Sequence, residues 1–513
     1  MLTLFAAVAG SAVAQSPLPC LDQSLAPPDR IDACTGAIAN PGLDSDTRAL
    51  VLTARGALLL AMDRPHAALA DFDAAAAASP GDANVSLGRG RALEAIGETA
   101  AAESAYSAAL TIDRGLADAL LRRGDLRLQA GRTAAGIADL GEARRLAPRD
   151  PAPFRIRGQY FLSQGKSEDA IGELRQAVML DDGDFASWSA LGRALIAAND
   201  LGGAVAAFDR AIFLRPDDLE TVGARANAYG RAGHFAAAMR DYDQVLAARP
   251  DDRRARAARG VAALNAGQID LAIRDFTFLL REQPADSELL YFRGTARLQA
   301  QDAAGAAADF SAIVATTPRD PDALAGRAES AVLAGNWSSA LADLSTALDS
   351  GADLALLLRR GQVQALAGNW QAALEDFTIA PSSDESALWR AIAAVRNGVE
   401  VGQFLSESAL RFGGTPWPGA AFKFLLGDST ADDVRIAAGP KFTATADMVL
   451  AAAALATGMC DQAASYLQRA GAASGDGFAS TLARAERARL SATLAANMTA
   501  PHCSRPGSRL ASP

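Results

Sequence analysis

The sequence predicts an all-α structure that grows by repetition, and three observations support this prediction. The chain has 513 residues, too many for one ordinary hydrophobic core, so it forms either several domains or one long array. Half of its residues are apolar but only 6% are aromatic, which suits thin packing of helix on helix. Small residues also recur at a strict interval of 34, and such a period is the sequence signature of an α-solenoid.

The repeat is marked by a glycine or alanine that recurs every 34 residues, with one step of 33 before the last. A small residue follows the marker by twelve positions and a large apolar residue by sixteen, as Gly56, Ala68 and Phe72 show in the first repeat. The ten marker positions are Gly56, Gly90, Gly124, Gly158, Gly192, Ala226, Gly260, Gly294, Ala328 and Gly361.

Each mark has a physical role in a pair of antiparallel helices. The two small residues let the helices approach closely, and the large residue fills the space beside them. A proline such as Pro80 or Pro250 ends the second helix because it cannot donate a backbone hydrogen bond. A glycine seven residues after the marker, as at Gly97 and Gly267, forms the turn between the two helices.

These positions resemble the tetratricopeptide repeat (TPR) consensus throughout about residues 49–383. The resemblance implies a right-handed superhelix of about ten repeats, in which each repeat has a first helix A and a second helix B. It also implies a continuous concave groove. Because TPR proteins are scaffolds that bind other proteins, we expect a protein-binding function, no enzymatic activity and no cofactor.

A second periodic feature pairs an arginine with an acid across the two helices. An arginine directly precedes the marker in nine of the ten repeats, and an acid follows that arginine by sixteen residues in eight. In the fifth repeat both are absent together, as Leu191 and Ala207. We therefore predict structural ion pairs, called clips below, whose arginines are not available to a ligand. The clips are Arg55 with Asp71, Arg123 with Asp139, Arg157 with Glu173, Arg225 with Asp241, Arg259 with Asp275, Arg293 with Asp309, Arg327 with Asp343, and Arg360 with Asp376.

The N-terminus predicts an exported protein. Residues 1–14 are a short apolar run that ends in small residues at Ala12 and Ala14, which is typical of a secretory signal, although the usual basic start is missing. We expect cleavage after Ala14 and a periplasmic or secreted protein, with a cytoplasmic scaffold as the alternative. No apolar run reaches the roughly 20 residues that a membrane-spanning helix needs.

The four cysteines lie on either side of the repeats and allow three pairings. We favour the local pairing over four unpaired thiols, and it would staple an N-terminal cap, residues 15–48, that contains a helix from Asp29 to Ile38. The favoured disulfides are Cys20 with Cys34 and Cys460 with Cys503.

Residues 384–513 depart from the repeat pattern. Their order resembles the terminal region of some proteobacterial envelope TPR proteins, including lipoproteins that act as adaptors in murein turnover. An enzyme or a regulatory domain in this region is the alternative function. Trp417 is either an anchor for a partner or a packing residue. The expected elements are helices 386–396 and 401–412, a break at 413–419, a divergent repeat at 451–470 and a closing helix at 479–497.

Several other chemistries are excluded by composition and spacing. The net charge of -10 argues against binding to nucleic acid, which needs a basic surface. The three histidines, His66, His234 and His502, have no metal-ligand or nucleophile partner at a meaningful spacing. Residues 165–167, Gly-Lys-Ser, end like a phosphate-binding loop, but Tyr160 replaces its first glycine and the segment falls on a repeat turn.

The TPR resemblance places a ligand against helix A, on the side opposite helix B. Four arginines outside the clips lie on that side in repeats four to seven and make the middle of an acidic protein locally basic. We therefore expect an extended or acidic peptide segment as the ligand, and a solvated face without a single ligand is the alternative. The predicted ligand-binding residues are Arg91, Arg155, Gln159, Arg193, Asn227, Arg231, Arg254, Asn265, Tyr291 and Gln299.

Overall fold

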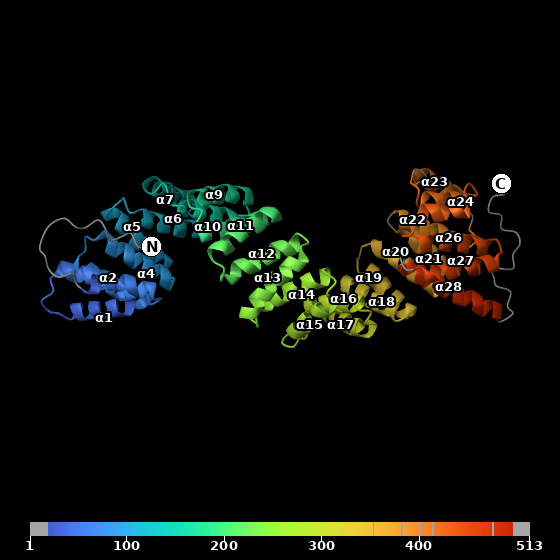
Figure 1. The fold of residues 1–513 in the computed structure, drawn as a ribbon, viewed down its shortest axis with the longest axis horizontal. Helices are drawn as coiled ribbons and strands as arrows, with labels where there is room; N and C mark the ends of the chain where they lie inside the picture. The colour runs from blue at the N-terminus through green and yellow to red at the C-terminus, as the bar shows by residue number, and fades with distance from the viewer. Residues whose placement is uncertain are drawn as a thin grey trace. The chain divides into compact units, whose positions relative to one another are not determined.

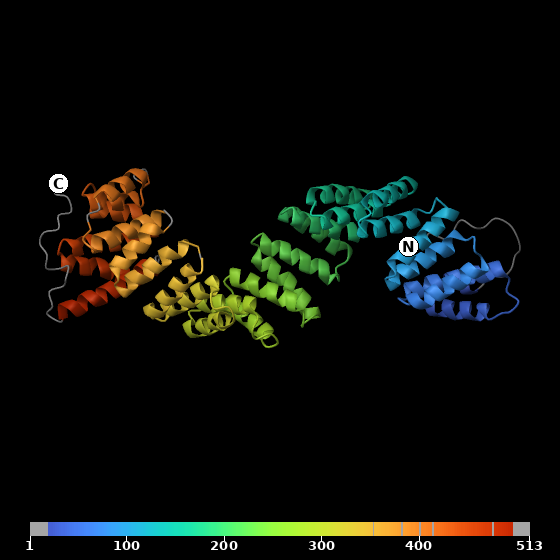
Figure 2. The same ribbon diagram turned by 180° about the vertical axis from the view of Figure 1, so that it is seen from behind.

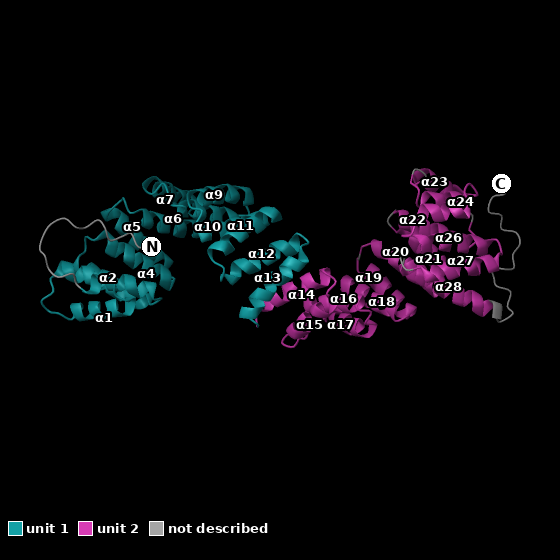
Figure 3. Cartoon of the chain, in the orientation of Figure 1, with its two compact units in different colours: residues 1–250 teal, residues 251–513 magenta. Residues whose placement is uncertain are grey.

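The structure is a computed structural model that describes residues 19–351, 353–380, 383–399, 402–412, 415–473 and 477–495. These residues form helices and no strand (Figure 1), which confirms the predicted all-α class. The chain divides into two compact units, residues 1–250 (unit 1) and 251–513 (unit 2), as Figure 3 shows. The predicted signal at 1–14, His502 and Cys503 lie outside the described residues.

Unit 1 contains a leading segment and six helix pairs, one pair for each predicted repeat (Figures 1 and 2). The leading segment is the short helix η1 (Pro19–Leu21) followed by α1 (Pro27–Ile38). The first two residues of α1 are prolines, which the first turn of a helix tolerates. The pairs are α2 (Ser45–Ala61) with α3 (Pro65–Ala78), α4 (Ala83–Ile96) with α5 (Thr99–Ile112), α6 (Ala117–Gln129) with α7 (Thr133–Leu146), α8 (Ala152–Ser163) with α9 (Ser167–Leu180), α10 (Phe185–Ala197) with α11 (Leu201–Leu214), and α12 (Leu219–Arg231) with α13 (Phe235–Ala248).

Unit 2 contains four further pairs and a C-terminal group of seven helices. The pairs are α14 (Arg253–Asn265) with α15 (Ile269–Leu280), α16 (Ser287–Gln299) with α17 (Ala303–Thr316), α18 (Pro321–Leu333) with α19 (Trp337–Asp349), and α20 (Ala355–Ala367) with α21 (Trp370–Ile379). The C-terminal group is α22 (Asp384–Arg396), α23 (Gly402–Phe412), α24 (Gly419–Leu426), α25 (Ala431–Ala438), α26 (Thr443–Ala456), α27 (Cys460–Ala472) and α28 (Gly477–Ala495).

The turn between helix A and helix B has the same backbone conformation in all ten repeats. The residue seven positions after the marker has a positive φ, whether it is a glycine or one of three other residues, Asp63, Asn199 and Gln301. A left-handed residue at this place lets the following amides bond back to the last carbonyls of helix A. The predicted turn is confirmed, and it also forms where the sequence has no glycine.

The marker glycines allow the close approach that their periodicity predicts. A methyl group added at Gly294 would lie 2.9 Å from the ring of Phe310, and one added at Gly260 would lie 2.8 Å from the ring of Phe276. Both rings are fully buried. The large residue of helix B therefore packs directly on the backbone of helix A, as the three marks of the repeat predict.

Helix A lines the inner side of each unit. Successive A helices contact one another, as α8 does with α10 and α10 with α12 in unit 1, and as α14 does with α16 and α16 with α18 in unit 2. Successive B helices make no comparable contacts among the described residues. Because the A helices crowd together while the B helices spread, each unit curves with helix A on the inside.

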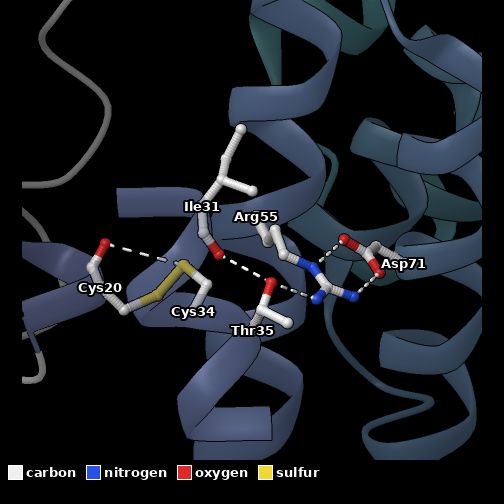
Figure 4. The surroundings of a disulfide bond; sticks show 6 residues. All are labelled: Cys20, Ile31, Cys34, Thr35, Arg55 and Asp71. Carbon is white, nitrogen blue, oxygen red and sulfur yellow. Dashed lines mark hydrogen bonds and ion pairs between the residues drawn. A yellow bond between two sulfur atoms is a disulfide. The ribbon is translucent and has the colours of Figure 1, made fainter. Parts of the chain in front are cut away.

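The predicted disulfide between Cys20 and Cys34 is present and joins η1 to α1 (Figure 4). Cys34 is the one fully buried residue of α1. The neighbouring Thr35 hydroxyl accepts a hydrogen bond from Nη1 of the clip residue Arg55 at 2.9 Å. In several later repeats the clip arginine meets a hydroxyl or carboxylate of the preceding helix B. No repeat precedes the first one in the array, and α1 takes the place of that preceding helix B.

The C-terminal helices fold back onto the last repeats. α28 contacts α20 as well as α26 and α27, and α26 contacts α22, the helix that follows α21 in the place of another helix A. Glu486 of α28 accepts a hydrogen bond from Arg396 of α22 at 2.7 Å, and Arg489 donates to the carbonyl of Leu366 in α20. The helix expected at 479–497 is α28. Together with α26 it covers the inner side of α20 and α22, in addition to closing the stack.

Trp417 is a packing residue in this arrangement. Its ring stacks on Phe442 with centroids 5.7 Å apart, and it packs against the hydrophobic core formed by the C-terminal helices. Every residue of α26 from Ala444 to Leu455 is buried, so this helix forms the centre of the C-terminal group.

Candidate functional site

The predicted clips form, and seven of the eight are two-pronged. In each of the seven, Nε and Nη2 of the arginine donate to the two oxygens of the aspartate at 2.6 to 3.0 Å. The acids are well shielded, since Asp275 and Asp309 are each only 2% exposed. The clip arginines therefore hold helix A to helix B and do not point at a ligand.

The eighth clip, Arg157 with Glu173, is single-pronged. Only Nη2 of Arg157 reaches Oε1 of Glu173, at 2.8 Å, while Nε of Arg157 and Oε2 of Glu173 have no hydrogen-bond partner. Burial raises the pKa of Glu173, and the charge of Arg157 opposes this shift. The longer glutamate side chain thus fits the clip less well than the aspartate found in the other seven.

Replacing Glu173 with aspartate is expected to stabilise α8 and α9 by about 1 kcal/mol, because the two-pronged geometry adds one hydrogen bond. Local hydrogen exchange of these helices measures the change. The same substitution in an Arg157→Leu background serves as the control and should give no gain. A gain that persists without Arg157 would contradict the explanation.

Arg89 has no acid at the clip position of its own repeat, and it reaches back to the preceding repeat instead. Its Nε donates to Oδ1 of Asp73 on α3 at 2.7 Å. Both side chains are about half exposed, 46% and 52%, so this is a surface pair that contributes little to stability.

In unit 1 the predicted ligand-binding arginines lie near acids of the next helix A. Nε of Arg155 is 3.6 Å from Asp184, and Nη1 of Arg193 is 3.6 Å from Glu220. Nε of Arg91 lies 3.7 Å from Asp118 in the same arrangement. These long ion pairs partly balance the positive charge that the sequence suggested for this surface.

The remaining predicted residues of unit 1 are polar, and one of them, Arg231, is exposed and has no acid partner among the described residues. Arg231 donates to the carbonyl of Ile196 and to the side chain of Asn199. Gln159 is half-buried and Asn227 is exposed.

A partly buried polar cluster on α4, α5 and α6 was not predicted from the sequence. Nη1 of Arg122 lies 3.4 Å from Glu94, and its Nε lies 3.1 Å from Asp118. The hydroxyl of Tyr106 donates to the same Glu94, and burial raises the pKa of this tyrosine. In the sequence, the only sign of this cluster is an acid, Glu94, that precedes Arg122 by 28 residues, an interval shorter than one repeat. These internal pairs occupy the inner side of repeats two and three.

In unit 2 the predicted residues are exposed on α14 and α16. Arg254 is exposed and forms no ion pair with any residue in the described part of the chain. Asn265 is exposed and donates to the carbonyl of Val261 at 2.9 Å. Tyr291 is 38% exposed and meets the rings of Phe292 and Phe310 edge-on. Gln299 is also exposed.

A cavity of about 450 Å³ lies between α14 and α16, and of the predicted residues Arg254 is part of its lining. Its floor is apolar, since the rings of Phe276 and Phe292 stack there with centroids 5.6 Å apart. This cavity was not predicted from the sequence, and it forms where α14 has two alanines, Ala257 and Ala258, in a row. The full lining is Arg253, Arg254, Ala257, Ala258, Val261, Phe276, Leu279, Gln283, Asp286, Glu288, Leu289 and Phe292.

Within the described ranges, no helix is long and apolar enough to cross a membrane. Nor do three or more histidine, cysteine, aspartate or glutamate side chains gather there in a way that could hold a metal ion.

Several solved structures are similar to parts of this chain. A TPR protein from Parabacteroides merdae is 17% identical, with 48% of this chain and 98% of that chain covered and a TM-score of 0.39. MamA from Desulfovibrio magneticus is 22% identical, with 33% and 97% covered and a TM-score of 0.32. The pilF protein of Pseudomonas aeruginosa is 16% identical, with 40% and 95% covered and a TM-score of 0.36.

No curated protein matches the chain significantly. A family model described as tetratricopeptide repeat matches it six times, and together the matches span more than half of its length. The matched residues are 53–117, 121–184, 155–218, 224–275, 258–321 and 326–387. The chain belongs to the TPR family.

Proposed function

We propose that the protein is an exported adaptor that binds an extended or acidic segment of another protein on the inner, helix A side of unit 2. Its TPR repeats support a scaffold for protein–protein interaction. The observation that carries the finer proposal is the exposed Arg254 at a cavity with an apolar floor, with Asn265 and Tyr291 also exposed on α14 and α16. Such side chains on rigid helices can bind the backbone and the carboxylates of a peptide without reorganising.

The distribution of charge favours unit 2 over unit 1 as the binding surface. Arg155 and Arg193 already have acids within 4 Å, and Arg231 already donates to the Ile196 carbonyl and the Asn199 side chain. A peptide carboxylate would have to compete with these groups. Arg254 has no such competitor among the described residues. An acidic partner segment therefore gains most by binding at α14.

Two features support export. The apolar N-terminus resembles the apolar core of a secretory signal and ends, as such signals do, in small residues. The disulfide between Cys20 and Cys34 is a bond that persists in oxidising compartments such as the periplasm and is rare in the cytosol.

The full-length protein, tagged at its C-terminus and expressed in its native host, is expected in the periplasmic fraction without residues 1–14. One or a few envelope proteins should be recovered with it in stoichiometric amounts. Fractionation and mass spectrometry measure both. Recovery in the cytoplasm alone, with an intact N-terminus, would contradict export.

Replacing Arg254 with glutamate is expected to weaken binding of the recovered partner at least tenfold, because an attraction to the partner's carboxylate becomes a repulsion. Isothermal titration calorimetry measures the change. Arg145→Glu is the matched control, because it makes the same charge change on a helix B, outside the proposed binding surface. The Arg145 side chain is 67% exposed. Equal affinities for the wild type and the Arg254→Glu variant would refute binding at α14.

A further inference from the structure

We infer that the cavity between α14 and α16 binds one apolar side chain of the partner, while a carboxylate on one side of that residue binds Arg254. The inference rests on the proposed function and adds to it a recognition motif. The motif is an aromatic or leucine-sized residue with an acid on one side only.

The lining of the cavity selects an apolar side chain. Phe276 and Leu279 form a fully buried floor, and Leu289 is also buried. The walls are the half-buried Ala257 and Val261, which offer no hydrogen-bonding side chain. A cavity of about 450 Å³ falls within the range of pockets that bind small ligands, and one large side chain enters it readily.

The charges at the rim fix the position of the acid. Arg253 is already held by Glu282 and Gln283 at 2.7 and 2.9 Å, so the positive charge left at the α14 rim is that of Arg254. On the opposite rim stands the exposed Glu288 of α16. A carboxylate is attracted to the first rim and repelled from the second, so the partner can carry an acid on only one side of its apolar residue.

One position of the repeat, which lines the cavity at Ala257, changes size along unit 2. Ala257, Tyr291 and Ala325 occupy the same place in three successive repeats. The array thus already contains an aromatic side chain at this position. Ala257→Tyr therefore fills the cavity with a residue that the fold accommodates one repeat later, and Ala325→Tyr is its matched control outside the cavity lining.

The test is selection of a random heptapeptide library, displayed on phage, against the full-length protein and three variants. The wild type and Ala325→Tyr are expected to enrich an apolar residue with an acid on one side. Ala257→Tyr should keep the acid and lose the apolar residue, and Arg254→Glu should keep the apolar residue and lose the acid. A synthetic peptide carrying the motif should bind Ala257→Tyr at least tenfold more weakly than the wild type, while circular dichroism shows that both are folded.

The outcomes separate the inference from the function on which it rests. If Ala257→Tyr enriches the same apolar position as the wild type, the cavity is not the subsite, while peptide binding by unit 2 stands. If the wild type enriches acids alone, Arg254 is a ligand residue and the apolar part of the motif is wrong. If the wild type enriches no peptide, both the proposed peptide site and the inference fail.

Discussion

Replacing Asp309 with asparagine is expected to destabilise α16 and α17 by about 3 to 5 kcal/mol. The Asp309 side chain is 3% exposed and accepts hydrogen bonds from Arg293 at 2.6 and 3.0 Å and from Arg297 at 2.7 Å. An asparagine has one acceptor oxygen and no charge, so it leaves two largely shielded guanidinium groups without the carboxylate that balances their charge. Removing one side of a buried ion pair costs this much because the other charge stays buried.

Local hydrogen exchange of α16 and α17 is the appropriate measurement for Asp309→Asn, since a repeat array need not unfold in one step. Asp73→Asn is the control, because it breaks the exposed pair with Arg89 and should cost no more than about 1 kcal/mol. Equal losses in the two variants would show that burial does not determine the strength of the clips.

Reducing the disulfide between Cys20 and Cys34 is expected to release α1 from the first repeat. The bond closes a loop of 14 residues, and the loss of such a constraint costs about 3 kcal/mol in the chain-entropy account. Little else holds α1, since Cys34 is its one fully buried residue. The hydrogen bond from Arg55 to Thr35 should be lost with it.

Hydrogen exchange of α1, with and without dithiothreitol, measures this release, and α16 serves as an internal reference far along the chain. The double variant Cys20→Ser, Cys34→Ser should show the exchange of the reduced protein and no further response to the reductant. Unchanged protection of α1 on reduction would mean that packing on α2 holds it without the disulfide.

The sequence was sufficient to predict the features that recur in every helix pair or nearly every one. The marker glycines, the left-handed turns and the clips all depend on residues at most sixteen positions apart, and their phase repeats ten times. In the fifth repeat Leu191 and Ala207 replace both members of the clip at once, and this joint replacement indicates that the two positions contact each other.

Contacts between repeats were harder to predict, because each kind occurs in only some of the repeats, as with Arg91 and Asp118 or Arg123 and Ser107. Arg193 meets Glu220 of the following repeat, whereas Arg89 meets Asp73 of the preceding one. The cavity at Ala257 depends on the small side chains of one helix and on Phe292 in the next. The fold-back of α28 onto α20 joins residues such as Arg489 and Leu366, for which the sequence has no periodic signal.

If unit 2 binds a partner segment as proposed, the fold-back limits the length of that segment. Because α26 and α28 cover α20 and α22, the inner surface that remains belongs to α14, α16 and α18. Packed helices lie about 8 to 10 Å apart, so these three span roughly 20 Å from axis to axis. An extended chain advances about 3.3 Å per residue, and roughly six residues fill that length. Under the proposed function, a segment of about this length fits the inner surface of unit 2, and the chain's own C-terminal helices limit it at one end.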